Sequence, residues 1–176
     1  MDSEKWIILD ALVGIILFYR KGCVVEIGVG SSTDILAKHA KKANVPLYTC
    51  DLNKNISPLF NKHFHFNCSS LHFINQFDSI PSVVFLDGNH DYDVTIKEVE
   101  FFLDKMIIGG VIFMHDTYPP SEQHLTHKYC SDSYKLRQEY EKRTDIVDCF
   151  TWPYTSGNCG LTMMIKKDPK RPYYKR

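Results

Sequence analysis

The sequence of 176 residues has no excess of charge of either sign, because 21 lysine and arginine residues balance 21 aspartate and glutamate residues. A balanced chain produces no net field that would attract it to nucleic acid or to an anionic membrane. It also lacks a long apolar run: the stretch 6–19 is too short to span a bilayer and contains Asp10. We therefore expect a small or neutral partner, no nucleic acid and no membrane.

No two of the six cysteines have the close spacing of a zinc site or a redox motif. This scatter is typical of reduced thiols in a cytoplasmic protein. The sequence also lacks a basic leader with a small-residue cleavage site, an internal repeat and a low-complexity linker. With 44% hydrophobic residues, the chain can bury one sizeable core, and we expect a single domain over residues 1–176.

Short apolar runs alternate with helical patterns along most of the sequence. Strands are predicted at 23–27, 47–50, 62–66, 82–86, 111–114, 146–150 and 161–165. Helices are predicted at 4–19, 34–44 and 132–143, with another after the fourth strand, where Ile96, Val99, Leu103 and Met106 share a face. This alternation predicts an α/β fold with a mostly parallel sheet, closed by an antiparallel hairpin and followed by a flexible tail at 166–176.

Polar residues follow the predicted strands at the ends where open α/β sheets bind ligands. Gly28 and Gly30 let the backbone turn sharply and approach a ligand, although many strand-to-helix connections need glycine. Asp51 ends the second strand, 23 positions after Gly28, where a carboxylate can accept both hydroxyls of a ribose. Glu26 lies inside an apolar strand, so it needs a partner, either N–H groups of the loop or an ammonium group of a ligand.

At these residues the sequence resembles a known family. The segment 25–33, VEIGVGSST, resembles the first motif of class I S-adenosylmethionine-dependent methyltransferases, and Asp51 matches their ribose-binding position. The segments DGNHDY at 87–92, GG at 109–110 and HD at 115–116 resemble a subgroup of small O-methyltransferases with relatives acting on sugars and natural products. The resemblance implies a single Rossmann-like class I methyltransferase fold, with a mostly parallel seven-stranded sheet and a C-terminal antiparallel hairpin.

The resemblance also implies a site for S-adenosylmethionine. Its cofactor-binding residues would be Glu26, Gly28, Gly30, Ser32, Thr33, Asp51, Leu52, Cys68, Ser69 and Asp87. Among them, Glu26 and the two glycines would cradle the methionine part, and Cys68 and Ser69 would lie beside the adenine. Ser32 stands where the family often has a third glycine, which makes the approach to the cofactor more crowded.

The resemblance implies a second, catalytic group of residues. In metal-dependent relatives, the position of Asp87 and an acidic pair after the fifth strand bind magnesium, while the position of His90 supplies a general base. Here the first member of that pair is His115, followed by Asp116, and hard cations prefer oxygen ligands. We therefore expect Asp87, His115 and Asp116 to bind either magnesium or a softer divalent ion. The alternative is that His115 serves proton transfer instead.

We predict that His90 and Asp87 carry the catalysis. Methyl transfer is an in-line displacement at a sulfonium-bound carbon, so an acceptor hydroxyl must be held close and lose its proton, for which imidazole is suited near neutral pH. The alternative is a structural role, in which His90 caps the following helix or binds a loop carbonyl. The loop 118–130 is a candidate lid or a solvated loop, and Trp152 and Tyr154 are candidates for a pocket or for the core.

Three functions are compatible with these residues. The first is O-methylation of a small hydroxyl-bearing substrate, either a sugar or a secondary metabolite. The second is an NAD-dependent oxidoreductase, which is weakened by Thr33 at the place of the last glycine of the dinucleotide motif. The third is a non-catalytic cofactor-binding domain. The chain is short for the family, so a second subunit of a homo-oligomer could complete the acceptor pocket.

Overall fold

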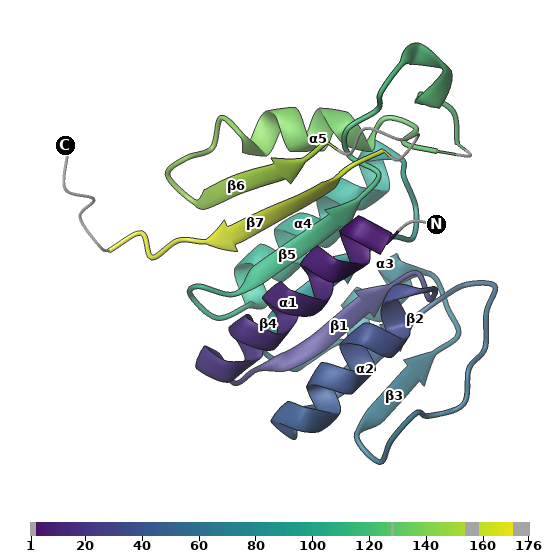
Figure 1. The fold of residues 1–176 in the computed structure, drawn as a ribbon, viewed down its shortest axis with the longest axis vertical. Helices are drawn as coiled ribbons and strands as arrows, with labels where there is room; N and C mark the ends of the chain where they lie inside the picture. The colour runs from purple at the N-terminus through teal and green to yellow at the C-terminus, as the bar shows by residue number, and fades with distance from the viewer. Residues whose placement is uncertain (1–2, 128, 154–158, 171–176) are drawn as a thin grey trace.

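The computed structural model describes residues 3–127, 129–153 and 159–170. In this part of the chain seven strands form one sheet, with helices on both of its faces (Figure 1). The strands are β1 (Cys23–Ile27), β2 (Leu47–Cys50), β3 (His63–Phe66), β4 (Pro81–Leu86), β5 (Val111–His115), β6 (Val147–Trp152) and β7 (Leu161–Lys166).

The strand order is β3-β2-β1-β4-β5-β7-β6. The first five strands are parallel, and β7 is antiparallel to both β5 and β6. The order reverses between β1 and β4, and open α/β sheets bind ligands at the carboxyl ends of the strands at such a point. The topology therefore places the ends of β1, β2, β4 and β5 around the predicted site.

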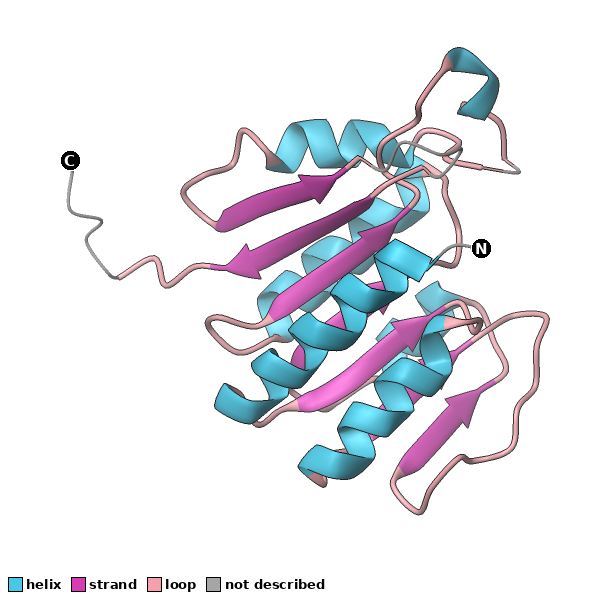
Figure 2. Cartoon of the chain, in the orientation of Figure 1, coloured by secondary structure: helices cyan, strands magenta, loops and turns pink. Residues whose placement is uncertain are grey.

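Two layers of helices cover the sheet (Figure 2). One layer contains α1 (Ser3–Tyr19) and α2 (Ser32–Ala43), and the other contains α3 (Ser70–Gln76), α4 (Tyr92–Lys105) and α5 (Ser133–Tyr140). A 3-10 turn, η1 (Glu122–His124), lies in the loop after β5. Both faces of the central strands are thus buried, which explains their continuous apolar runs.

Neighbouring residues of β1 belong to two different cores, because successive side chains of a strand point to opposite faces. Val24 packs in the cluster that contains residues of α1 and α2. Val25 and Ile27 pack in the cluster that contains residues of α3, α4 and α5. Glu26 is on the same face as Val24 and is fully buried, so the first strand carries a carboxyl group into the interior.

The predicted fold class, the seven strands and the terminal hairpin are confirmed, with shifts of one or two residues at fewer than half of the strand ends. The prediction omitted α3, because its seven residues, SLHFINQ, are too few to show a helical period. The one local signal is Ser69, whose Oγ accepts a hydrogen bond from His72 N over 3.3 Å as an N-cap. The end of the predicted tail, 171–176, lies outside the described residues.

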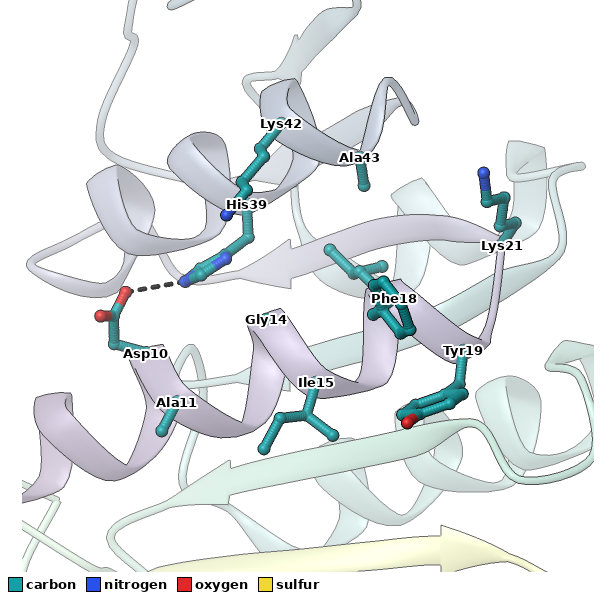
Figure 3. Close-up of a pocket in the computed structure, with 11 residues that line it drawn as sticks. Asp10, Ala11, Gly14, Ile15, Phe18, Tyr19, Lys21, His39, Lys42 and Ala43 are labelled. Carbon is teal, nitrogen blue, oxygen red and sulfur yellow. Dashed lines mark hydrogen bonds and ion pairs between the residues drawn. The ribbon is translucent and has the colours of Figure 1, made fainter.

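A groove of about 710 Å³ runs between α1 and α2 (Figure 3). Asp10 Oδ1 lies 2.8 Å from His39 Nε2 across this groove. A Cβ atom on Gly14 would lie only 2.8 Å from the His39 ring, so the absence of a side chain there lets the two helices pack. None of the predicted site residues lines the groove. Across the described residues, no helix combines the length and the apolar character needed to cross a membrane.

Candidate functional site

The two glycines of the turn between β1 and α2 have different surroundings. Gly28 has a left-handed φ of +87°, and a Cβ atom built on it would lie 2.1 Å from the carbonyl oxygen of Asp87. The ends of β1 and β4 therefore approach so closely that only glycine fits. A Cβ atom on Gly30 would meet nothing within 4 Å, so the space beside this residue is open.

Glu26 provides a buried carboxyl group next to this turn. Ser32 Oγ donates a hydrogen bond to Glu26 Oε1 over 2.5 Å, whereas the buried Oε2 atom has no hydrogen-bond partner among the described residues. Burial raises the pKa of Glu26 to about 8, although the hydrogen bond from Ser32 acts in the opposite direction. A ligand cation at Oε2 would satisfy this oxygen and restore its charge.

Asp51 follows β2 and is held by the backbone on both of its oxygens. Val29 N donates to Asp51 Oδ2 over 2.9 Å, and the N–H groups of Asn53 and Lys54 donate to Oδ1 over 2.8 Å each. Burial would raise the pKa of Asp51, but these hydrogen bonds outweigh it and hold the pKa below its ordinary value. Oδ1 thus already accepts two hydrogen bonds, whereas Oδ2 accepts one and can accept another from a ligand.

The remaining predicted cofactor residues lie around β2 and the start of α3. Cys50 Sγ donates to the carbonyl oxygen of Cys68 over 3.2 Å, and the two sulfur atoms are 4.0 Å apart. Ser69 is occupied as the N-cap of α3. Leu52 is 64% exposed, so its side chain is accessible for contact with a ligand.

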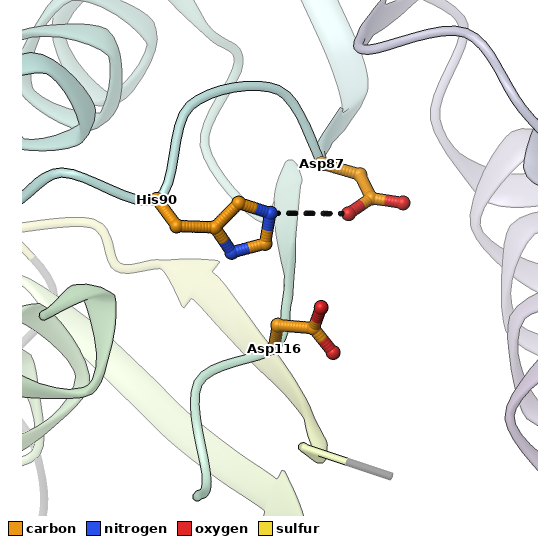
Figure 4. A group of neighbouring side chains, drawn as sticks. All are labelled: Asp87, His90 and Asp116. Carbon is orange, nitrogen blue, oxygen red and sulfur yellow. Dashed lines mark ion pairs between the residues drawn. The ribbon is translucent and has the colours of Figure 1, made fainter. Parts of the chain in front are cut away.

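A second group of side chains lies at the ends of β4 and β5 (Figure 4). His90 Nε2 lies 3.7 Å from Asp87 Oδ1, a distance typical of an ion pair rather than of a hydrogen bond. One ligand atom each of Asp87, His90 and Asp116 lies within 4.8 Å of the others. Asp116 adopts a left-handed φ of 55°, which turns the chain away from β5 directly after His115.

His115, the last residue of β5, lies between the two carboxylates of this group. Its Nδ1 atom is 3.0 Å from Asp87 Oδ1 and 3.2 Å from Asp116 Oδ1. Burial would lower the pKa of His115, but hydrogen bonds to Asp116 and Asp87 outweigh it and raise the pKa to about 9. Trp6 of α1 stacks on the His115 ring at a centroid distance of 5.8 Å and an angle of 9°. The imidazolium form of His115 thus balances part of the negative charge.

The donor atoms of this group do not suit magnesium, which demands oxygen ligands in octahedral geometry. Only two carboxylates are present in the group, and both of them already contact the His115 ring. Two carboxylates and a histidine are a donor set for a softer divalent metal. Such a metal would have to compete with His115 for both carboxylates.

The loop after β5 is attached to the sheet at its start and at its end. Tyr118 N donates to the carbonyl oxygen of Cys159 over 2.5 Å, and the Arg137 guanidinium lies 4.8 Å from the centre of the Tyr118 ring. Cys130, at the other end of the loop, is fully buried. Trp152 packs at the edge of the core that contains α1 and α2, as its core interpretation predicted, and Tyr154 lies outside the described residues.

The structure thus arranges the predicted residues in two groups. Glu26, Ser32 and Thr33 form one group with the backbone near Asp51, and Asp87, His90, His115 and Asp116 form the other. The sequence analysis missed two contributors. Lys54 supplies an N–H group to Asp51, for which its position three residues later is a weak signal, and Trp6 has no local signal at all.

Comparisons with known proteins agree with this geometry. A family described as a methyltransferase domain matches residues 25–117. No curated protein sequence matches the chain. Among solved structures, the cofactor-bound protein Rv0187 from MTB is 16% identical, with a TM-score of 0.71 over 96% of this chain and 82% of that one.

Two solved O-methyltransferases are also similar. The enzyme from Bacillus cereus, in complex with SAH, is 17% identical, with a TM-score of 0.67 over 95% of this chain and 82% of its own. TomG from Streptomyces achromogenes, involved in tomaymycin synthesis and in complex with SAM, is 16% identical, with a TM-score of 0.67 over 96% and 82% of the two chains. At these identities the likeness shows a shared fold.

Proposed function

Because this chain belongs to the family of methyltransferase domains, we propose that it transfers a methyl group from S-adenosylmethionine to a hydroxyl oxygen of a small molecule. The observation that carries the proposal is the open space at Gly30 beside Glu26, whose buried Oε2 atom has no partner among the described residues. A buried carboxyl oxygen of this kind is costly unless a ligand completes its hydrogen bonding.

The cofactor would extend along the ends of β1 and β2. Its ammonium group would bind Glu26, and the methionine part would lie against Gly30 and the N-terminus of α2. A ribose hydroxyl would donate to Asp51 Oδ2, and the surrounding N–H groups keep this carboxylate charged. The adenine would lie beside Cys68 and Ser69, close to the exposed Leu52.

His90 would act as the general base of the transfer. S-adenosylmethionine, when bound, would supply the methyl group: the acceptor oxygen would take the methyl carbon, and the electron pair of the broken carbon–sulfur bond would stay on sulfur as a thioether. The hydroxyl proton moves to the His90 ring, and Asp87, 3.7 Å away, stabilises the resulting charge. The acceptor is a sugar or a secondary metabolite. Because the donor set does not suit magnesium, the proton transfer is assigned to His90 and Asp87 and not to a magnesium-bound oxygen.

Calorimetric titration of the purified protein with S-adenosylhomocysteine, S-adenosylmethionine and NAD tests the cofactor. We expect micromolar binding of both adenosyl ligands, and we expect Asp51→Ala to weaken it at least about tenfold, which corresponds to about 1.4 kcal/mol. Asp78→Ala is the matched control, because the Asp78 side chain is 95% exposed and pairs with Lys105. Binding of NAD alone would favour the oxidoreductase and contradict the proposal.

Turnover of a panel of sugars and hydroxylated natural products tests the reaction. His90→Gln should lower kcat by about 10²–10⁴, the usual contribution of a general base, while the Kd for S-adenosylhomocysteine stays unchanged. Adenosyl binding without turnover of any acceptor would instead support the non-catalytic cofactor-binding domain. If a homo-oligomer completes the acceptor pocket, turnover should appear only at protein concentrations at which the oligomer assembles.

A further inference from the structure

The segment 51–62, between β2 and β3, starts at the proposed ribose-binding residue and is held by a line of hydrogen bonds. His65 Nε2 lies 2.9 Å from the carbonyl oxygen of Lys54, and His65 Nδ1 lies 2.9 Å from Thr49 Oγ1. Thr49 Oγ1 also lies 2.9 Å from His63 Nε2, and His63 Nδ1 accepts from Leu59 N over 3.0 Å. We call the side chains of Thr49, His63 and His65 the histidine–threonine network.

The backbone groups at the two ends of this row of hydrogen bonds determine which nitrogen of each histidine ring carries the proton. Leu59 N–H can only donate, so His63 Nδ1 accepts and the His63 proton is on Nε2. The Lys54 carbonyl can only accept, so His65 donates through Nε2 and its Nδ1 atom accepts. Thr49 Oγ1 therefore accepts from His63 and gives its single proton to His65. Every donor has an acceptor only while both rings are neutral.

This network holds the same backbone that holds Asp51. Lys54 presents its carbonyl oxygen to His65 and its N–H group to Asp51 Oδ1. The ammonium group of Lys54 in addition donates to Val29 O over 2.5 Å, and Val29 N donates to Asp51 Oδ2. The position of Lys54 therefore couples the network to both oxygens of the carboxylate.

The surroundings of His63 favour its neutral ring. Thr49 is fully buried and His63 is 3% exposed, with the Phe60 ring stacked at 6.1 Å. Burial, and then the neighbouring His65, lower the pKa of His63.

Other charged groups near the network have partners of their own. On the same segment, the Lys54 ammonium binds Val29 O and the Lys62 ammonium binds Asn44 at the end of α2. From the end of β2, Asp51 faces the backbone of Asn53 and Lys54. Among the described residues, no carboxylate contacts His63 or His65 to stabilise a charged ring.

We propose that Thr49, His63 and His65 are positioning residues that hold Asp51 in place for the ribose of the adenosyl cofactor, and that protonation of His63 weakens this binding. The inference rests on the proposed function, because it assigns the ribose to Asp51. Protonated His63 would carry a proton on Nδ1 as well, and this N–H group would face the N–H group of Leu59. The hydrogen bond from Leu59 N to His63 Nδ1 would therefore be lost as the pH falls.

The first test compares two substitutions of Thr49. Thr49→Val has nearly the same shape but no hydroxyl, whereas Thr49→Ser keeps it. The ligand is 5′-methylthioadenosine, which has the ribose but no ammonium group, so the titration of Glu26 does not contribute. We expect Thr49→Val to raise its Kd about tenfold, and Thr49→Ser to stay within about twofold of the unmodified protein, since both hydrogen bonds of Thr49 Oγ1 are lost in the first only.

The second test is the pH profile of the same Kd. We expect the Kd of the unmodified protein to stay constant between pH 7.5 and 6.5 and to rise as the pH falls further, because the pKa of His63 lies below its ordinary value of 6.5. Thr49→Val should show a shallower profile, because its link from His63 to His65 is already broken, although the hydrogen bond from Leu59 N to His63 Nδ1 remains. Asp51 stays charged over this range, since its pKa lies below the ordinary value of a carboxylate. A role in folding alone would lower Tm and leave this profile unchanged.

Long-range ¹H–¹⁵N NMR correlations at pH 7.5 test the proton assignment directly. Both His63 and His65 should show the tautomer protonated on Nε2, and the opposite tautomer at either ring would overturn the network. Normal binding by Thr49→Val at every pH, together with a loss in Asp51→Ala, would overturn the inference and leave the proposed function intact. If the unmodified protein binds no adenosyl ligand, both are wrong.

Discussion

Gly28 and Gly30 are two positions apart, yet replacing each of them with alanine should have opposite consequences. At Gly28 the new Cβ atom would meet the Asp87 carbonyl oxygen at 2.1 Å and the adjoining carbonyl carbon at 2.5 Å. Both atoms belong to the backbone, so neither can move away as a flexible side chain would. The left-handed φ of Gly28 adds about 1–2 kcal/mol of strain for alanine.

The cost of Gly28→Ala follows from these two terms. Overpacking in a well-packed interior costs about 1–3 kcal/mol, so with the backbone strain we expect a net loss of about 3 kcal/mol in the free energy of unfolding. For a domain of this size each kcal/mol lowers Tm by about 2–4 °C. Thermal unfolding followed by circular dichroism should therefore show a decrease of about 10 °C.

Gly30→Ala is the matched control. Its φ is not in the left-handed region and its Cβ atom meets no protein atom, so we expect unchanged or slightly higher stability, by about 0.4–1 kcal/mol. The Cβ atom would instead occupy the space assigned to the cofactor and raise the Kd for S-adenosylhomocysteine at least about tenfold. Equal Tm values for Gly28→Ala and the unmodified protein, or unchanged binding in Gly30→Ala, would refute the reasoning.

Three further predictions concern charge, metal and backbone. The folded-state pKa of Glu26, about 8, lies above its ordinary value of 4.5, so the free energy of unfolding should fall as the pH rises between these values, by at most about 1.4 kcal/mol per unit. In urea unfolding, the free energy of unfolding of Glu26→Gln should depend less steeply on pH than that of the unmodified protein. An equal slope for the two proteins would contradict this. Turnover should stay within about twofold when a chelator is added, whereas loss of activity that magnesium restores would show that a metal is required. Asp116→Ala should be about 1 kcal/mol less stable to urea than Asp116→Asn, because asparagine tolerates the left-handed φ of 55°; equal midpoints would argue against backbone strain there.

The sequence predicted the sheet well because its strands are buried on both faces and therefore appear as continuous apolar runs, such as 23–27. It also indicated Glu26, because a carboxyl group inside such a run needs a partner, and Ser32 is that partner. These signals are local in sequence, so no tertiary information was needed.

The contacts that shape the rest of the site join distant parts of the chain. Trp6 meets His115 across more than a hundred residues, and His115 meets Asp87 only because β4 and β5 are neighbours in the sheet. The sequence left two roles open for His115, that of a metal ligand and that of a proton carrier. Its place between two carboxylates depends on strand register and on the turn at Asp116, neither of which a motif encodes.

The position of β7 between β5 and β6 has a consequence for synthesis on the ribosome. Until residues 161–166 have emerged, the growing chain carries β5 as an open edge, with unpaired N–H and C=O groups along an apolar strand. Translation proceeds at about 5–20 residues per second, so this edge stays exposed for seconds after β5 itself is made. The nascent chain therefore exposes an edge that favours edge-to-edge aggregation during this interval.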